Sequence, residues 1–282
     1  MILITYLPFY RIHEVTEYFL KNVEVLRPRQ AIVYIDNVYH GKQREFISKV
    51  VPDNVEVRFG NWRNRNDTWL TILSDLHTMS GDDALVVDSD NVVDPALVEI
   101  HTVLRSSPIY TVLDWEAWGS GYPRQFMVRS RRVGDVELGS GTRPIYAYRV
   151  FDVGNVFRSG SLFFIGPKQV VSIMKPPDVE LINRVRQALS RVDPWLRNFI
   201  SDETLLGILA HLMGIEEVPW TVASHHHYHA SAPGTAPKHL VALAHRQFAK
   251  ALYGVFRRRE FLAYYIKYSM AFLKNALPVF LQ

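Results

Sequence analysis

The sequence contains no cysteine, and this absence excludes several kinds of site at once. Disulfide bonds, thiolate metal centres and cysteine nucleophiles all need a residue type that the 282-residue chain does not have. Long apolar runs are also missing, because no stretch reaches the roughly 18 uninterrupted residues that suggest a membrane span. The opening "MILITYLPFYR" has no basic region and is typical of a first strand rather than a signal peptide. We therefore expect a cytoplasmic protein.

The composition is that of an ordinary globular protein, but the charge is unevenly distributed. Hydrophobic residues make up 48% of the chain and charged residues 21%, which is enough for a sizeable core. The formal net charge is +4, yet residues 238–282 hold eight lysines and arginines against one acid, Glu260. We predict a main domain over residues 1–237 and a basic helical extension over 238–282. Nothing in the sequence matches a nucleic-acid-binding motif.

Strands and helices alternate in the first hundred residues. A helical pattern over 13–26 follows the first of three β-rich runs, which are 2–8, 31–36 and 55–59. A second helical stripe begins near Asn66 or Asp67, either of which is a suitable helix cap. Its apolar members are Trp69, Leu70, Ile72, Leu73, Leu76 and Met79. This alternation predicts an α/β fold with a mostly parallel central sheet flanked by helices.

The middle of the chain has a different character. Residues 114–160 are rich in glycine and turn formers, which predicts long loops with some antiparallel pairing, a usual place for a substrate cover. The run "SGSLFFIG" (159–166) predicts a further strand. After it, Ser201 caps a clear helix that Gly214 ends.

The stretch "ALVVDSDNVVDP" (84–95) places Asp88 and Asp90 directly after a short apolar strand. Open α/β sheets bind ligands at this end of their strands. Three interpretations compete: a solvated loop, a metal site, and a nucleophile with its acid partner. The last resembles haloacid-dehalogenase-type phosphatases, which open with D-x-D-x-V. The later acidic pair of that family is absent, however, and the motif here follows three strands instead of lying on the first.

The order of the motifs resembles that of GT-A glycosyltransferases, in particular the inverting, metal-dependent family 2 type. The resemblance covers roughly residues 1–230. It includes the opening strand and helix, "IVYIDN", "NWRNRNDTWLTIL", the D-x-D motif, and the acidic helix "SDETLLGILAHLMGIEEVPW" with the histidines behind it. It implies transfer of a sugar, such as a hexose, from a UDP-, GDP- or dTDP-linked donor to an unknown hydroxyl acceptor. A sugar nucleotidyltransferase is disfavoured, since "TYLPFYR" lacks a glycine-rich phosphate cradle.

The resemblance also implies roles for single residues. Mn²⁺ or Mg²⁺ would be bound by Asp90, with Asp88 on the ribose or the metal shell, and it would neutralise the departing diphosphate. Within "SHHHYHASAPG", His227 is the first candidate to complete the coordination and His225 the second. The donor nucleotide would be contacted by Thr5, Leu7, Asp36, Arg63 and Asp88.

The catalytic base would be Glu203, which takes the proton from the acceptor hydroxyl. Asp202 stays an alternative, because the order of the acidic pair is reversed relative to the family pattern. Acids in the first turn of a helix are also favoured by its dipole without any catalytic role.

The segment 256–281 is rich in Phe, Leu and Tyr, but Lys267, Lys274 and Pro278 interrupt it. Its arginines at 257–259 predict docking to anionic lipid at the inner face of the cell membrane, within reach of a lipid-linked acceptor. Packing against the sheet or in a homodimer interface is an equal alternative. A non-catalytic protein that binds sugar nucleotides and docks to membranes is the non-enzymatic hypothesis.

Overall fold

The computed structural model describes most of the chain. The described residues are 1–62, 65–79, 84–93, 95, 99, 102, 109–113, 127–138, 141–150, 171–174, 177–200, 202–213, 216–219, 223–225 and 237–280.

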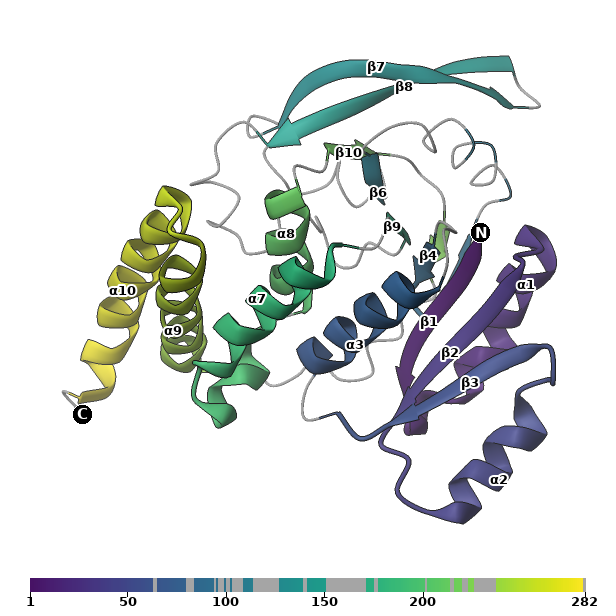
Figure 1. Cartoon of the computed structure of the whole chain (residues 1–282), viewed down its shortest axis with the longest axis horizontal. Helices are drawn as coiled ribbons and strands as arrows, with labels where there is room; N and C mark the ends of the chain where they lie inside the picture. The colour runs from purple at the N-terminus through teal and green to yellow at the C-terminus, as the bar shows by residue number, and fades with distance from the viewer. Residues whose placement is uncertain are drawn as a thin grey trace.

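Four parallel strands form one half of the nine-stranded sheet that the described residues build (Figure 1). Strand β1 (Ile2–Pro8) lies between β2 (Gln30–Asp36) and β4 (Ala84–Val87), and β3 (Val55–Gly60) pairs with the outer side of β2. Strands β1, β2 and β4 are nearly continuous apolar runs, because helices cover both faces of a parallel sheet. The predicted α/β fold with a parallel sheet is confirmed for this half.

Beyond β4 the sheet is mixed. Strand β9 (Val171–Met174) pairs antiparallel with β4 and with β6 (Ile109–Leu113), and β10 (Glu216–Pro219) runs parallel to β6. The last two strands, β8 (Gly141–Val150) and β7 (Met127–Leu138), form a long antiparallel hairpin. This hairpin confirms the antiparallel pairing expected within 114–160. The strand predicted at 159–166 lies outside the described residues.

One face of the sheet is covered by the helical segment that follows β1. It comprises η1 (Phe9–Arg11), the π-helical η2 (Val15–Phe19) and α1 (Leu20–Leu26), so the helix predicted at 13–26 is confirmed. The inward side chains of β1 on this face, Leu3 and Leu7, pack with Val15 and Phe19. Helix α2 (Gly41–Val50) was not expected from the sequence; Ile47 is its one buried residue, so its apolar periodicity is weak.

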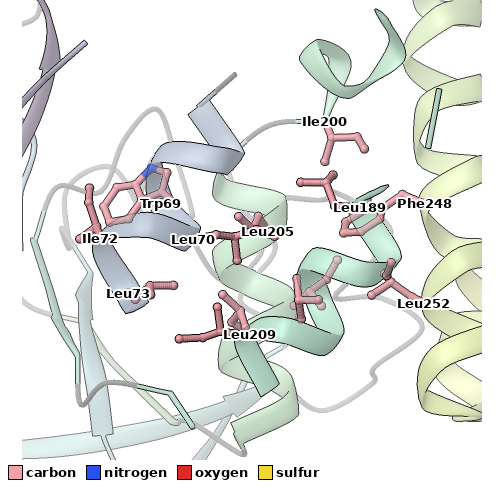
Figure 2. Close-up of a cluster of buried hydrophobic side chains, with 14 of the residues drawn as sticks. Trp69, Leu70, Ile72, Leu73, Leu189, Ile200, Leu205, Leu209, Phe248 and Leu252 are labelled. Carbon is pink, nitrogen blue, oxygen red and sulfur yellow. The ribbon is translucent and has the colours of Figure 1, made fainter. Parts of the chain in front are cut away.

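The opposite face carries α3 (Arg65–Thr78), α7 (Val179–Ser190) and α8 (Asp202–Met213). Figure 2 shows the hydrophobic cluster in which these helices meet. Its labelled members are Trp69, Leu70, Ile72, Leu73, Leu189, Ile200, Leu205, Leu209, Phe248 and Leu252. The apolar stripes expected on α3 and α8 therefore form one core.

The C-terminal helices belong to this core as well. Helix α9 (Lys238–Phe256) packs against α7 and the short helix η4 (Pro194–Phe199), and α10 (Arg259–Phe280) packs against α9. The helical extension expected from residue 238 is thus confirmed as helical. No helix among the described residues has the length and hydropathy that a membrane crossing requires.

Candidate functional site

The carboxyl ends of the four parallel strands meet at one edge of the sheet. Pro8, Asp36 and Gly60 are register partners at the ends of β1, β2 and β3. Strand β4 ends at Val87, so the D-x-D loop follows at the same edge. Ligands bind outside this edge in open α/β sheets. The structure therefore brings three of the predicted positions, Asp36, Asp88 and Asp90, to one side of the sheet.

Asp36 ties the ends of three strands together. Its side chain is buried, and its Oδ1 accepts hydrogen bonds from the backbone N–H groups of Asn37 (2.7 Å) and Trp62 (3.2 Å). The hydroxyl of Tyr6, on β1, lies 3.5 Å from Oδ2. Asn37 has a positive φ of 60°, a left-handed conformation that asparagine tolerates better than most residues. Asp36 therefore organises this edge, and its predicted contact with a nucleotide stays a prediction.

Gly60 and Trp62 explain the "FGNW" sequence at the end of β3. A Cβ atom on Gly60 would lie 2.3 Å from the indole ring of Trp62, so only glycine lets the ring lie this close to the backbone. The same indole contacts two tyrosine rings, at centroid distances of 6.4 Å from Tyr6 and 6.2 Å from Tyr34. The packed ring holds the backbone N–H of Trp62 where it donates to Asp36.

The D-x-D loop is bound to the segment that follows β1 by a closed chain of polar contacts. Ser89 Oγ donates to Glu14 Oε2 at 2.5 Å, and Arg11 Nε donates to Glu14 Oε1 at 2.5 Å. Arg11 Nη2 also donates to Asp90 Oδ2 at 3.0 Å, so the D-x-D loop is bound through both Ser89 and Asp90. Ser89, Asp90 and Glu14 are all buried. The loop is therefore held firmly between β4 and β1.

Acidic side chains outnumber basic ones among the described residues of this cluster. Asp88, Asp90 and Glu14 contribute three carboxylates and Arg11 contributes one guanidinium. Burial lowers the pKa of Arg11, but hydrogen bonds and charge attraction from Glu14 and Asp90 outweigh it, so the pKa is raised overall. Glu14 and Asp90 are each only 7% exposed, so bulk water screens their charge poorly. Attraction between these carboxylates and a nearby cation is therefore strong.

The donor chemistry of the loop fits a hard divalent cation, which prefers carboxylate oxygens. Histidine would add a nitrogen ligand suited to Mn²⁺. No group of three His, Asp or Glu side chains close enough to hold a metal occurs within the described residues. In this structure Asp90 is paired with Arg11 instead. The metal site therefore stays a prediction.

The strand that carries His225, the second candidate ligand, lies beside the D-x-D loop. Strand β11 (Ala223–His225) pairs antiparallel with β5 (Asn91–Val93), which directly follows Asp90. In this register His225 is the partner of Asn91. Two segments at least 130 positions apart in the sequence thus lie side by side. His227, the first-choice ligand, lies outside the described residues, and the roles of both histidines stay predictions.

The predicted acidic helix is confirmed as α8, whose first two residues are Asp202 and Glu203. The chain just before it is anchored by Asn66, whose Nδ2 donates to the backbone carbonyl of Ile200 at 2.8 Å. Asn66 lies in the first turn of α3, which begins just beyond the carboxyl end of β3. This hydrogen bond links the start of α8 to the edge that carries Asp36.

The helix cap expected at Asn66 or Asp67 is wrong, because both residues lie in the first turn of α3. Helix α3 begins at Arg65, so Asn66 already lies inside its first turn. Its buried side chain bonds to Ile200 and not to a free N–H group of its own helix.

Three further residues, Thr5, Leu7 and Arg63, are predicted to contact the nucleotide. Thr5 and Leu7 are both fully buried in β1, so neither side chain is open to solvent in this structure. The hydroxyl oxygen of Thr5 has no hydrogen-bond partner in the part of the chain that the structure describes. Arg63 lies outside the described residues. Nucleotide binding by these three positions stays a prediction.

Sequence reasoning missed four residues that build this edge: Arg11, Glu14, Ser89 and Trp62. Their roles depend on which strands are neighbours. One signal was available, since Arg11 and Glu14 are one helical turn apart with opposite charges, directly after the first strand.

No family model matches the sequence, and no curated protein matches it. Several solved structures are similar in arrangement at low sequence identity. An N-terminal fragment of TarS from S. aureus, in complex with UDP-GlcNAc, is 14% identical, with 96% of this chain and 73% of that chain covered and a TM-score of 0.49. A nucleoside-diphosphate-sugar pyrophosphorylase from Vibrio cholerae is 11% identical, with 78% and 91% covered and a TM-score of 0.39.

The galactosyltransferase LgtC, in complex with donor and acceptor sugar analogues, is 11% identical. The match covers 51% of this chain and 57% of that chain, with a TM-score of 0.32. Since all three TM-scores lie below 0.5, these similarities assign no function to the chain.

Proposed function

We propose that this protein is a glycosyltransferase that moves a sugar from a nucleotide-diphosphate sugar to a hydroxyl acceptor. The proposal rests chiefly on the D-x-D loop, which lies at the carboxyl edge of the parallel strands with the histidine-bearing β11 directly beside it. The tether from Asn66 to the chain before the acidic helix α8 gives further support. These are three of the motifs that carry the resemblance to GT-A enzymes.

The chemistry of the donor explains why carboxylates beside the strand ends would suit this reaction. A diphosphate leaving group gains negative charge as its bond to the anomeric carbon breaks. Asp90 and Asp88, with His227 or His225, would hold Mn²⁺ or Mg²⁺, which would stabilise that charge as a Lewis acid. The contacts from Arg11 and Glu14 fix the loop before any donor arrives, and a fixed site loses less entropy on binding.

The second half of the reaction needs a base on the acceptor side. Glu203, or Asp202 in its place, would remove the proton of the acceptor hydroxyl as its oxygen attacks the anomeric carbon. A direct attack of this kind inverts the configuration of that carbon. The hydrogen bond between Asn66 and Ile200 would keep the start of α8 at a fixed distance from the donor.

The test measures release of nucleoside diphosphate from UDP-, GDP- and dTDP-sugars in the presence of Mn²⁺, with water or an added hydroxyl compound as the acceptor of the sugar, and Glu203→Gln is compared with the wild type. We expect donor affinity to stay near normal and turnover to fall by about 10²–10⁴-fold, the usual contribution of a general base. Glu180→Gln is the matched control, because Glu180 is an acid in the first turn of α7, and we expect it to leave turnover unchanged.

Each alternative predicts a different result. If Asp202→Asn loses turnover and Glu203→Gln does not, the base is Asp202. If both variants turn over normally, α8 is structural and the proposed mechanism is wrong. A wild-type protein that binds donor without turnover would support the non-catalytic hypothesis, and binding of beryllofluoride at Asp88 would support the phosphatase.

A further inference from the structure

Helix α10 is the outermost helix of the C-terminal pair (Figure 1). One of its faces, which includes Phe261 and Tyr264, is fully buried against the rest of the protein. A second apolar stripe faces solvent. Its members and exposed fractions are Leu262 (40%), Ile266 (51%), Met270 (67%) and Leu273 (59%). Their spacing at i, i+4, i+8 and i+11 places them on one side of the helix.

Cationic side chains border this stripe, which we call the α10 stripe. Arg257 and Arg258 are exposed just before the helix, Arg259 is its exposed first residue, and Lys274 is exposed near its other end. Lys267 lies one heptad before Lys274, on the same flank, with its ammonium group 4.9 Å from the ring centre of Tyr268. Basic residues thus lie at the start and along one side of the stripe.

Acidic residues are nearly absent from this region. The single acid between residues 238 and 282 is Glu260. It is engaged by His211 of α8 at 3.2 Å and by Arg258 at 3.6 Å, and both contacts lie at the beginning of α10. The exposed side of the helix therefore combines apolar side chains with basic ones, and no acid of residues 261–282 lies among them.

We infer that the α10 stripe is a docking surface for an anionic membrane. A helix with an apolar face and flanking lysines lies in the interface plane, with its apolar side chains at the acyl boundary and its cations at the headgroups. A second copy of the chain fits less well, because a two-fold contact between identical faces would bring two cationic surfaces together. This inference does not depend on the proposed transferase activity.

The experiment is co-sedimentation of the full chain with vesicles. Mixed phosphatidylglycerol and phosphatidylcholine vesicles are compared with vesicles of phosphatidylcholine alone. We expect binding to the anionic vesicles and a loss of it at high salt. A triple variant, Arg257→Gln, Arg259→Gln and Lys274→Gln, should reduce partitioning by about 100-fold, because each basic residue near such a surface contributes a factor of about five.

The apolar side is tested by the double variant Ile266→Ser and Met270→Ser, which we expect to reduce partitioning by at least about tenfold. Matched controls lie on other helices: Lys49→Gln on α2, where the side chain is 69% exposed, and Val25→Ser on α1, where the residue is 40% exposed. Both controls should bind vesicles as the wild type does.

Three results would overturn the inference: no sedimentation with anionic vesicles, equal sedimentation with pure phosphatidylcholine, or control variants that lose as much binding as the stripe variants. A dimer in light scattering that Met270→Ser dissociates, without vesicle binding, would assign the stripe to a second copy. Should the double variant fail to fold, the triple variant decides alone, since its three side chains are exposed.

Discussion

Substitutions of Asn66 test how the strand ends that carry Asp36 are held to the start of helix α8. Its side chain is 1% exposed, and its Nδ2 donates to the carbonyl of Ile200, two residues before Asp202. Asn66→Asp preserves the size and shape of the side chain but replaces the donating amide by an accepting carboxylate. The carbonyl of Ile200 would then face an acceptor, and the start of α8 would lose its anchor.

The magnitude follows from burial. A buried carbonyl that loses its donor costs about 1–3 kcal/mol, and a buried charge costs more, so we expect Asn66→Asp to lower the free energy of unfolding by about 3 kcal/mol or more. Asn66→Ala should be milder. The Oδ1 atom of Asn66 has no partner among the described residues, so the alanine variant removes an unsatisfied acceptor together with the donor.

The assay combines urea unfolding with transfer kinetics. Both variants should lower turnover more than donor affinity, because the strand ends that would bind the donor stay intact. Asn275→Ala is the control: Asn275 Nδ2 also donates to a backbone carbonyl, that of Ala271 at 2.7 Å, but on α10. The reasoning is refuted if Asn66→Asp is as stable as the wild type, or if the alanine variant is the less stable of the two.

Two further predictions concern histidines. Burial, with a smaller contribution from Lys267, lowers the pKa of His245 to about 4 from its usual 6.5. As the pH falls below 6.5, His245 is protonated in the unfolded chain but stays neutral in the folded protein. The free energy of unfolding should therefore be unaffected above pH 6.5 and fall by about 3 kcal/mol as the pH decreases to 4. Urea unfolding at pH 7 and pH 4.5 measures this loss of stability. In His245→Gln the free energy of unfolding should change less between the two pH values than in the wild type. An equal change in the variant and the wild type would contradict the prediction. His227→Ala should weaken Mn²⁺-dependent donor binding in calorimetry more than His226→Ala, whereas equal effects would argue against a single inward-facing ligand.

The parallel half of the fold could be predicted because its signals are local. Strands β1, β2 and β4 are short apolar runs, and β3 alternates apolar with charged residues. Each of the four lies within one residue of its expected bounds. The order of the mixed half could not be predicted. It depends on pairing between distant segments, such as Val86 with Ser172, and nothing within either segment encodes its partner. Helix α2 could not be predicted from an apolar stripe, because only Ile47 of its ten residues is buried.

The candidate site divides in the same way. Asp88 and Asp90 could be placed at a strand end, because an apolar run precedes them and a turn follows. Their partners could not be identified, since Arg11 meets Asp90 only because β1 and β4 are neighbours in the sheet. Asn66 shows the limit of a local rule. Its residue type and position predicted a helix cap, but its side chain donates a hydrogen bond to a backbone carbonyl 134 positions away in the sequence.

The most direct test of the central claim is calorimetric titration of the wild type and Asp90→Asn with UDP-, GDP- and dTDP-sugars in the presence of Mn²⁺. The control is Asp75→Asn, which likewise removes a carboxylate paired with an arginine, here Arg58 at 2.7 Å, but on α3 away from the D-x-D loop. We predict that the wild type and the control bind at least one donor, and that chelation of the metal abolishes this binding. Asp90→Asn should bind at least about tenfold more weakly while unfolding as cooperatively as the wild type. Binding of no donor by the wild type, or undiminished Mn²⁺-dependent affinity in Asp90→Asn, would contradict the account.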